Sequence, residues 1–194
     1  MSDTTETTTR TWRGVTIPTA GVFAIDPAHT RVDFVVRHLM VSKVRGAFSE
    51  VSGEVVVGAD PVDSTVTATI AAASIDTGVA DRDGHLRGAD FLDVATHPTL
   101  TFRSTGGLVT GEGNEFTLRG ELTVRDVTRE VELAVEFEGV ARSPWGQEVI
   151  GFTATTEIDR DDFGITWNQA LETGGVLVGK NVKITIDVQA VAAG

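Results

Sequence analysis

Alternation between apolar and polar residues recurs along most of this chain and constrains its fold more than any other feature. Glu130–Glu138 carries Val131, Leu133, Val135 and Phe137 at alternate positions, with glutamates at most positions between them. Because successive side chains of a strand point to opposite faces, a period of two predicts a strand with one buried and one solvated face. The same period appears in six further runs, which are Arg31–Arg37, Ser64–Ala73, Pro98–Ser104, Glu115–Arg125, Ile150–Ile158 and Val182–Val188.

Short turn segments separate these predicted strands. They are rich in the residues that break regular structure, and they include Gly58–Pro61, Gly106–Gly107, Gly111–Asn114, Ser143–Gly146 and Gly174–Gly175. Many strands joined by short turns favour an all-β antiparallel sandwich or barrel. The length of several runs favours the barrel, because an eight-stranded barrel leaves no open edge and can enclose one ligand.

One segment, residues 81–92, departs from the alternation. It begins with acidic residues, which suit the first turn of a helix, and it places Leu86 and Phe91 toward one side. Gly84 and Gly88 disfavour a long helix. We therefore predict a short helical segment that covers one end of the barrel as a lid.

The chain divides into two unequal parts. Residues 1–20 begin with a Thr-rich polar stretch and are expected to form a disordered or loosely docked tail, with Trp12, Val15 and Ile17 on the exterior of the barrel. Residues 21–194 are expected to form the barrel, because a chain of 194 residues suits one large all-β domain.

Targeting signals are not apparent in the sequence. A secretory signal needs a basic start followed by about 7–15 apolar residues, whereas residues 2–10 are mostly threonine and acidic residues. No stretch approaches the roughly 18 apolar residues of a membrane-spanning helix. We therefore expect a cytoplasmic location without stable membrane insertion, and the absence of cysteine is compatible with a reducing compartment.

Acidic residues outnumber basic ones by 28 to 16, which gives a formal charge of −12. Proteins that bind nucleic acid use lysine and arginine to neutralise phosphates. Attachment to an anionic membrane surface likewise depends on basic clusters. The overall charge argues against both kinds of partner.

Catalytic and metal-binding patterns are weak throughout the chain. Gly174–Asn181 resembles a phosphate-binding loop, but Asn181 stands where a hydroxyl must follow the lysine, and a strand pattern follows instead of a helix. The four histidines lack zinc-ligand spacing and have no cysteines beside them. The carboxylate pairs Asp81/Asp83 and Asp161/Asp162 are typical of solvated turns and caps. We predict no catalytic residue, metal or cofactor, and a protein that is not an enzyme.

Basic residues nevertheless cluster in two short stretches. Arg37, His38, Lys43 and Arg45 form one, and Arg82, His85 and Arg87 lie in the predicted lid. If both stretches line the barrel mouth, they meet an anionic or strongly polar head group while the ligand's tail enters the barrel. The alternative is ordinary ion pairing with the many aspartates and glutamates.

Ordered motifs from about Val22 to Val191 resemble the YceI-like family. The first is Asp26-Pro27-Ala28-His29 with an alternating strand, a second histidine and Gly46-Ala47-Phe48. Further matches, in order, are Ser74–Thr77, Asp81–Leu86, Asp90–Asp93, His97–Phe102, Gly120–Thr128, Arg160–Ile165 and Val178–Val182. The resemblance implies an extended, lipocalin-like, eight-stranded antiparallel barrel that binds a polyisoprenoid or isoprenoid quinone for transport, storage or quinone metabolism.

The expected ligand therefore lies in the barrel interior, and no nucleic acid is expected as a partner. The side chains expected to contact the ligand are Phe34, Val36, His38, Phe48, Ile70, His85, Leu86, Phe91, Phe102, Leu118, Leu122, Val135, Phe137, Phe152 and Phe163. Two alternatives stay open: an enzyme that acts on an isoprenoid diphosphate in the same pocket, and a packed structural or partner-binding barrel. Ligand length, head group and a homodimeric state are also left open.

Overall fold

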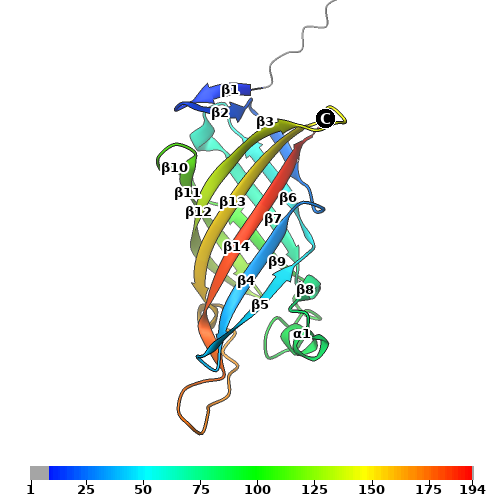
Figure 1. Cartoon of the computed structure of the whole chain (residues 1–194), viewed down its shortest axis with the longest axis vertical. Helices are drawn as coiled ribbons and strands as arrows, with labels where there is room; N and C mark the ends of the chain where they lie inside the picture. The colour runs from blue at the N-terminus through cyan, green and yellow to red at the C-terminus, as the bar shows by residue number, and fades with distance from the viewer. Residues whose placement is uncertain (1–8, 194) are drawn as a thin grey trace, which may run out of the picture.

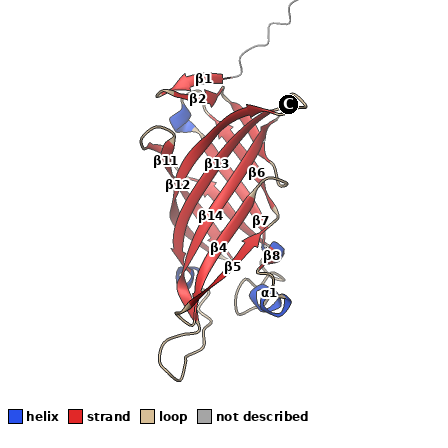
Figure 2. Ribbon diagram, viewed as in Figure 1, coloured by secondary structure: helices blue, strands red, loops and turns tan. Residues whose placement is uncertain are grey.

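The computed structural model describes residues 9–193 and shows a closed antiparallel β-barrel with one short α-helix (Figures 1 and 2). Eight strands form the ring in the order β14, β13, β12, β11, β9, β7, β6 and β3, and β3 pairs again with β14. The fold class predicted from the alternation is confirmed. The ring strands are β3 Gly21–Ile25, β6 Val51–Val57, β7 Thr65–Ala71, β9 Thr99–Ser104, β11 Glu115–Val124, β12 Val127–Arg142, β13 Glu148–Asp159 and β14 Val178–Ala192.

Three more strands extend the wall at one end. Strand β14 pairs with β3 through Ala190–Ala192 and with β4 through residues between Val178 and Asp187. β3 and β4 therefore act as one interrupted strand. β5 and β8 continue the wall beside β4. The helix α1 lies at this end, which we call the helix end, and a small hairpin of β1 and β2 lies at the other, the hairpin end (Figure 1). The additional elements are β1 Thr9–Trp12, β2 Val15–Pro18, β4 Arg31–His38, β5 Ser42–Phe48, β8 Ile75–Asp76, β10 Val109–Thr110, α1 Ala80–Arg87 and the 3₁₀ helices Pro61–Asp63, Ala72–Ser74 and Arg160–Phe163.

The interruption between β3 and β4 explains the Asp–x–x–His motif. The His29 imidazole lies 2.7 Å from an Asp26 carboxylate oxygen, and the Gln189 amide donates to the same oxygen at 3.0 Å. The hydrogen bond with His29 holds the pKa of Asp26 below its ordinary value. The buried Thr30 hydroxyl donates to the Gln189 carbonyl. This motif therefore pins the break in the strand to β14.

Four wall strands, β3, β5, β6 and β8, were not among the strands predicted from alternation. In β5 and β6 the inward positions are interrupted by Gly46 and Gly53. A Cβ atom at Gly46 would collide with the Phe34 ring, and one at Gly53, where φ is +146°, would collide with the Thr67 carbonyl. Glycine is required where another group approaches the backbone so closely. Because glycine stands at an inward position in β5 and in β6, the sequence there lacks the apolar residue that alternation would show.

The helix is shorter than the predicted segment 81–92. It spans Ala80–Arg87 and ends at Gly88, whose backbone is extended. Residues 88–92 continue as turns, held by a hydrogen bond from the Phe91 N–H to the Gly88 carbonyl. Asp83, buried in the helix, accepts hydrogen bonds from the Thr77 backbone and hydroxyl at 2.8 and 2.6 Å. The lid is thus a two-turn helix tied by its own acidic residue to Thr77, which directly follows β8.

The N-terminal hairpin differs from the expected exterior docking. Its strands β1 and β2 lie over the hairpin end, and Ile17 is buried in one of the apolar clusters of the interior, with Trp12 and Val15 packed against that cluster. The part of the tail prediction that concerns residues 1–8 lies outside the described residues. Among residues 9–193, no helix is long and apolar enough to cross a membrane.

Candidate functional site

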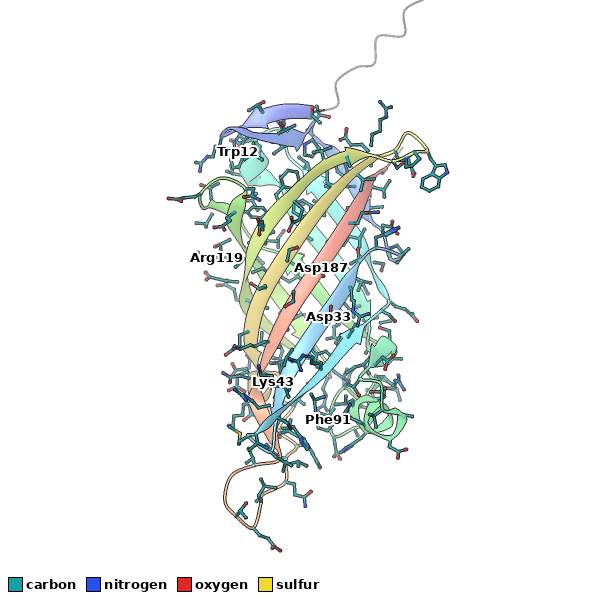
Figure 3. The ribbon with its side chains drawn as sticks, in the orientation of Figure 1. Trp12, Asp33, Lys43, Phe91, Arg119 and Asp187 are labelled. Atoms are coloured by element: carbon teal, nitrogen blue, oxygen red, sulfur yellow. The ribbon has the colours of Figure 1, made fainter. Side chains whose placement is uncertain are left out.

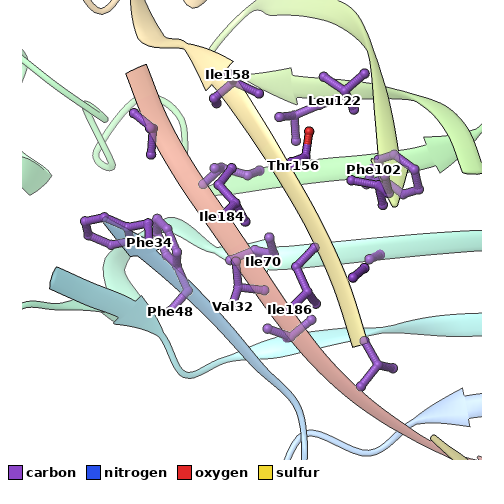
Figure 4. Close-up of a pocket in the computed structure, with 18 of the residues that line it drawn as sticks. Val32, Phe34, Phe48, Ile70, Phe102, Leu122, Thr156, Ile158, Ile184 and Ile186 are labelled. Carbon is purple, nitrogen blue, oxygen red and sulfur yellow. The ribbon is translucent and has the colours of Figure 1, made fainter. Parts of the chain in front are cut away.

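A cavity of about 480 Å³ occupies the barrel interior. Side chains from the inward positions of the wall strands line it, including those of β4, β7, β13 and β14 (Figure 4). Ile184 and Ile186 point into the barrel yet stay only partly buried, because they face open space and not an opposing side chain. A volume of this size lies within the range of pockets that enclose small ligands, about 300–1,000 Å³. The barrel therefore has an open bore.

All fifteen side chains predicted to contact a ligand line this one cavity. The wall strands contribute most of them, while His85 and Leu86 come from α1 and Phe91 and Phe163 from segments at the helix end. Alternation brings them together because each inward residue of a closed barrel faces the same interior. Their contact with a ligand stays a prediction.

The wall of the bore is almost entirely apolar, and Thr156 is an exception on β13. Its side chain lies between Ala154 and Ile158 in the wall, and Figure 4 shows its hydroxyl among apolar neighbours. Within residues 9–193 the structure assigns this hydroxyl no hydrogen-bond partner. Thr156 consequently offers an uncommitted hydroxyl along the apolar wall.

Aromatic rings close together at the helix end. The His85 ring meets Trp167 edge to face with centroids 4.7 Å apart, and it meets Phe91 in the same way at 5.0 Å. An Asp90 carboxylate oxygen lies 2.9 Å from His85 Nε2, with about half of each side chain exposed. This cluster joins α1 to the loop between Phe163 and β14. It forms one rim of the bore.

The predicted basic cluster is divided by the structure. His38, Arg82 and His85 line the cavity at the helix end, and Arg37 borders it with its side chain exposed on the outer face of β4. Arg87 instead donates to the carbonyls of residues 73 and 75, at 2.9 and 2.6 Å, and so holds the helix to β8. The other two members, 43 and 45, are exposed on the outer face of β5. Three of the seven basic side chains therefore reach the bore.

Arg160 is a cavity-lining residue that sequence reasoning missed. Its side chain is 5% exposed and donates to the carbonyls of Ile165, Trp167, Val178 and Gly179 at 2.7, 2.9, 3.4 and 3.0 Å. Burial lowers the pKa of its guanidinium, while the charges of the aspartates at 161 and 159 act in the opposite direction. Arg160 thereby fixes both ends of the loop that forms the rim. The Arg–Asp–Asp–Phe motif marked the position, but nothing in it reveals the carbonyl partners.

The hairpin end contributes a second set of residues that were not predicted. Trp12, Val15, Ile17 and Pro18 all line the cavity, so β1 and β2 cover this end of the bore. Figure 3 shows Trp12 at the opposite end of the barrel from Phe91 and Lys43. The hairpin strands contain only four residues each. That length is too short for a reliable alternation signal.

Other candidate sites have structural roles in the described chain. β14 begins at Val178, so the glycine-rich stretch before it leads into a strand and not into the helix of a phosphate-binding loop. Lys180 instead pairs with Asp161 at 2.6 Å. Among residues 9–193, no three histidine, aspartate or glutamate side chains are grouped to hold a metal ion. The prediction that the protein is not an enzyme stays a prediction.

Comparison with known proteins matches residues 23–190 to the YceI-like domain. A UPF0312 protein of Staphylococcus epidermidis is 44% identical over 165 residues, which cover 83% of this chain and 92% of that protein. Burkholderia cenocepacia BcnA superposes with a TM-score of 0.72 at 25% identity, covering 86% of this chain and 99% of that one. A polyisoprenoid-binding domain from Saccharophagus degradans superposes with a TM-score of 0.64 at 16% identity, covering 88% and 98%.

The domain match spans most of the chain and includes every strand of the closed ring in whole or in part. Two of the motifs that carry the resemblance have structural roles in the barrel. Asp26–His29 holds the break after β3 against β14, and Arg160 anchors the rim loop. The chain belongs to the YceI-like family.

Proposed function

We propose that this barrel binds a long-chain apolar lipid in its bore and serves as a carrier or store for it. The observation that carries the proposal is the open, almost wholly apolar cavity enclosed by the wall strands. Burying each methylene-sized group of a chain gains about 0.8 kcal/mol. A lipid tail that lies along the bore therefore binds through contact area alone, without a specific polar partner.

The polarity of the two ends supports an orientation for this ligand. Ionisable side chains at the helix end of the cavity are basic, and they include His38, Arg82 and His85, whereas Trp12 and Ile17 cover the hairpin end. We infer that the head group lies at the helix end and that the tail extends toward β1 and β2. An anionic or strongly polar head group suits these donors.

A polyisoprenoid or isoprenoid quinone is the proposed ligand class. The support is the structural likeness to the polyisoprenoid-binding domain of S. degradans, together with the apolar cavity of this chain. A packed structural barrel is at odds with that cavity. An enzyme in the same pocket would need a histidine facing a carboxylate inside the bore, whereas the His85–Asp90 pair lies at the rim with both groups half exposed.

The test is to identify what the purified protein holds. Native mass spectrometry and solvent extraction should reveal a long-chain lipid, and the emptied protein should take up a dispersed isoprenoid quinone at one molecule per barrel. Protein that is empty when purified, and that also takes up no quinone, would show that the proposed function is wrong.

A further inference from the structure

Three consecutive apolar side chains are exposed at the turn between β4 and β5. Leu39, Met40 and Val41 have 40%, 57% and 82% of their surfaces accessible. Leu39 and Met40 adopt positive φ values of 52° and 60°, a region that costs energy for residues other than glycine and asparagine. A polar Asn-Gly turn would serve the hairpin better. The fold therefore does not account for apolar residues at this tip.

The tip has a fixed shape. The Leu39 N–H donates to the Leu177 carbonyl at 2.8 Å, and the Val41 N–H donates to the His38 carbonyl at 3.2 Å. The first bond ties the tip to the loop that Arg160 anchors. Leu39, Met40 and Val41 are thus presented outward on a supported turn.

Unpaired cations flank the tip on the outer face of the hairpin. Arg37 and Lys43 lie directly opposite each other across β4 and β5, and Arg45 lies opposite Val35, two residues along. Like charges in that position destabilise a strand pair. Within residues 9–193, none of the three cations has a carboxylate within salt-bridge distance. These three cations therefore have no ion-pair partner among the described residues, although the chain carries a net charge of −12.

The tip also adjoins the bore. His38, which directly precedes the turn, lines the cavity, and so does Leu177. Figure 3 places Lys43 at the helix end, on the same side of the molecule as Phe91. An object bound at the tip therefore lies beside the end of the bore where the ligand's head group is proposed to sit.

We propose that the tip, Leu39–Val41 with the cations Arg37, Lys43 and Arg45, docks the barrel on the surface of an anionic lipid bilayer. The apolar side chains enter the interfacial layer, and the cations contact lipid phosphates. Three residues on a convex turn offer too little area for a stable protein interface, which buries about 800 Å² per partner. A bilayer needs no complementary shape. The net negative charge of the rest of the molecule keeps the attachment weak and orients it.

The proposal rests on the proposed function, because a bilayer is where a long-chain lipid resides. It also refines what net charge implies: the overall charge opposes attachment, while one local tip favours it. Docking at the helix end places the bore next to the lipids that it is proposed to take up.

Vesicle flotation of the full-length protein tests the proposal. We expect binding to vesicles of phosphatidylcholine mixed with phosphatidylglycerol, little binding to phosphatidylcholine alone, and loss of binding as salt screens the charges. Met40→Ser/Val41→Ser and, separately, Lys43→Gln/Arg45→Gln should each weaken the partitioning by about tenfold. Neither variant alters a cavity-lining side chain.

Trp145→Ser is the matched control, because Trp145 is 84% exposed in the β12–β13 turn at the hairpin end. It should leave vesicle binding unchanged. Loss of binding in Trp145→Ser with retention in the tip variants would overturn the proposal, as would wild-type protein that fails to float with anionic vesicles at low salt. Self-association that only the Met40→Ser/Val41→Ser variant abolishes, with vesicle binding intact, would assign the tip to an interface between copies.

Uptake of dispersed isoprenoid quinone separates this proposal from the proposed function. The tip variants should take up quinone from a detergent dispersion as the wild type does, but extract it slowly from anionic vesicles. If the wild-type protein takes up quinone but does not bind vesicles, the docking proposal is refuted and the proposed function stands. Vesicle binding without uptake of any quinone refutes the proposed function and leaves the docking tip in place.

Discussion

Replacing Ala68 with phenylalanine narrows the bore at a position where a small side chain leaves it open. Ala68 lies on β7, lines the cavity, and pairs across the sheet with Phe102 of β9. A phenylalanine ring there occupies the space of roughly one five-carbon isoprene unit. At about 0.8 kcal/mol for each buried carbon, displacing that unit costs about 4 kcal/mol of binding free energy. The dissociation constant for a long-chain ligand should therefore rise by about three powers of ten.

Quenching of tryptophan fluorescence by an isoprenoid quinone measures this change. Trp12 and Trp167 line opposite ends of the cavity, so a bound quinone ring lies near at least one of them. Ala134→Phe is the control, because Ala134 is exposed on the outer face of β12 and undergoes the same substitution. It should bind quinone as the wild type does.

Stability measurements distinguish a narrowed bore from misfolding as the cause of weaker quinone binding. Because the new ring fills empty space, the free energy of unfolding of Ala68→Phe should stay within about 1.5 kcal/mol of the wild-type value. A folded Ala68→Phe variant that binds quinone with the wild-type dissociation constant would mean that the ligand lies outside the bore. The apolar cavity would then not be the ligand site.

Four further outcomes follow from the structure. Thr156→Val should tighten binding of a pure hydrocarbon by about 1 kcal/mol, measured by the same titration, because it removes an uncommitted hydroxyl from the apolar wall. Arg160→Met should lower the free energy of unfolding by about 4 kcal/mol in urea titrations, and Arg160→Lys should not restore it, because a lysine cannot reach the carbonyls that this fork-shaped group serves. Burial alone raises the pKa of Asp83, but hydrogen bonds from Thr77 and the Arg87 charge bring the pKa below the ordinary 3.8. The ionised Asp83 therefore stabilises the fold above pH 3.8, and this stabilisation is lost as pH falls through the lowered pKa. Asp83→Asn should flatten this loss in acid unfolding. Ile150→Ala should cost about 2–5 kcal/mol in thermal unfolding, because Ile150 is fully buried and its removal leaves a void.

Period-two alternation was enough to predict the barrel and many of the wall residues that face its interior. In a closed barrel, one local rule decides the orientation of every wall residue, so Phe34, Leu118 and Phe152 could be assigned without knowing which strands pair. The rule fails where the backbone itself is crowded, as at Gly46 and Gly53. It also fails where burial depends on a distant surface. Ile17 is buried because the barrel end lies beneath it, and Arg160 because a later loop supplies its acceptors.

The pairing of β14 with β3 and β4 has a consequence for how the protein folds. Ile25 pairs with Ala190, and Val32 pairs with Ile186, so the seam of the barrel joins segments from nearly opposite ends of the described chain. Contacts between such distant segments make folding slow, on the scale of milliseconds to seconds, because loop-closure entropy must be overcome before they form. Until β14 docks, β13 and β4 each present an open edge that can pair with another molecule. Nascent chains are therefore most prone to aggregation just before this seam closes, and dilution or a holdase chaperone should raise the refolding yield more than added stability does.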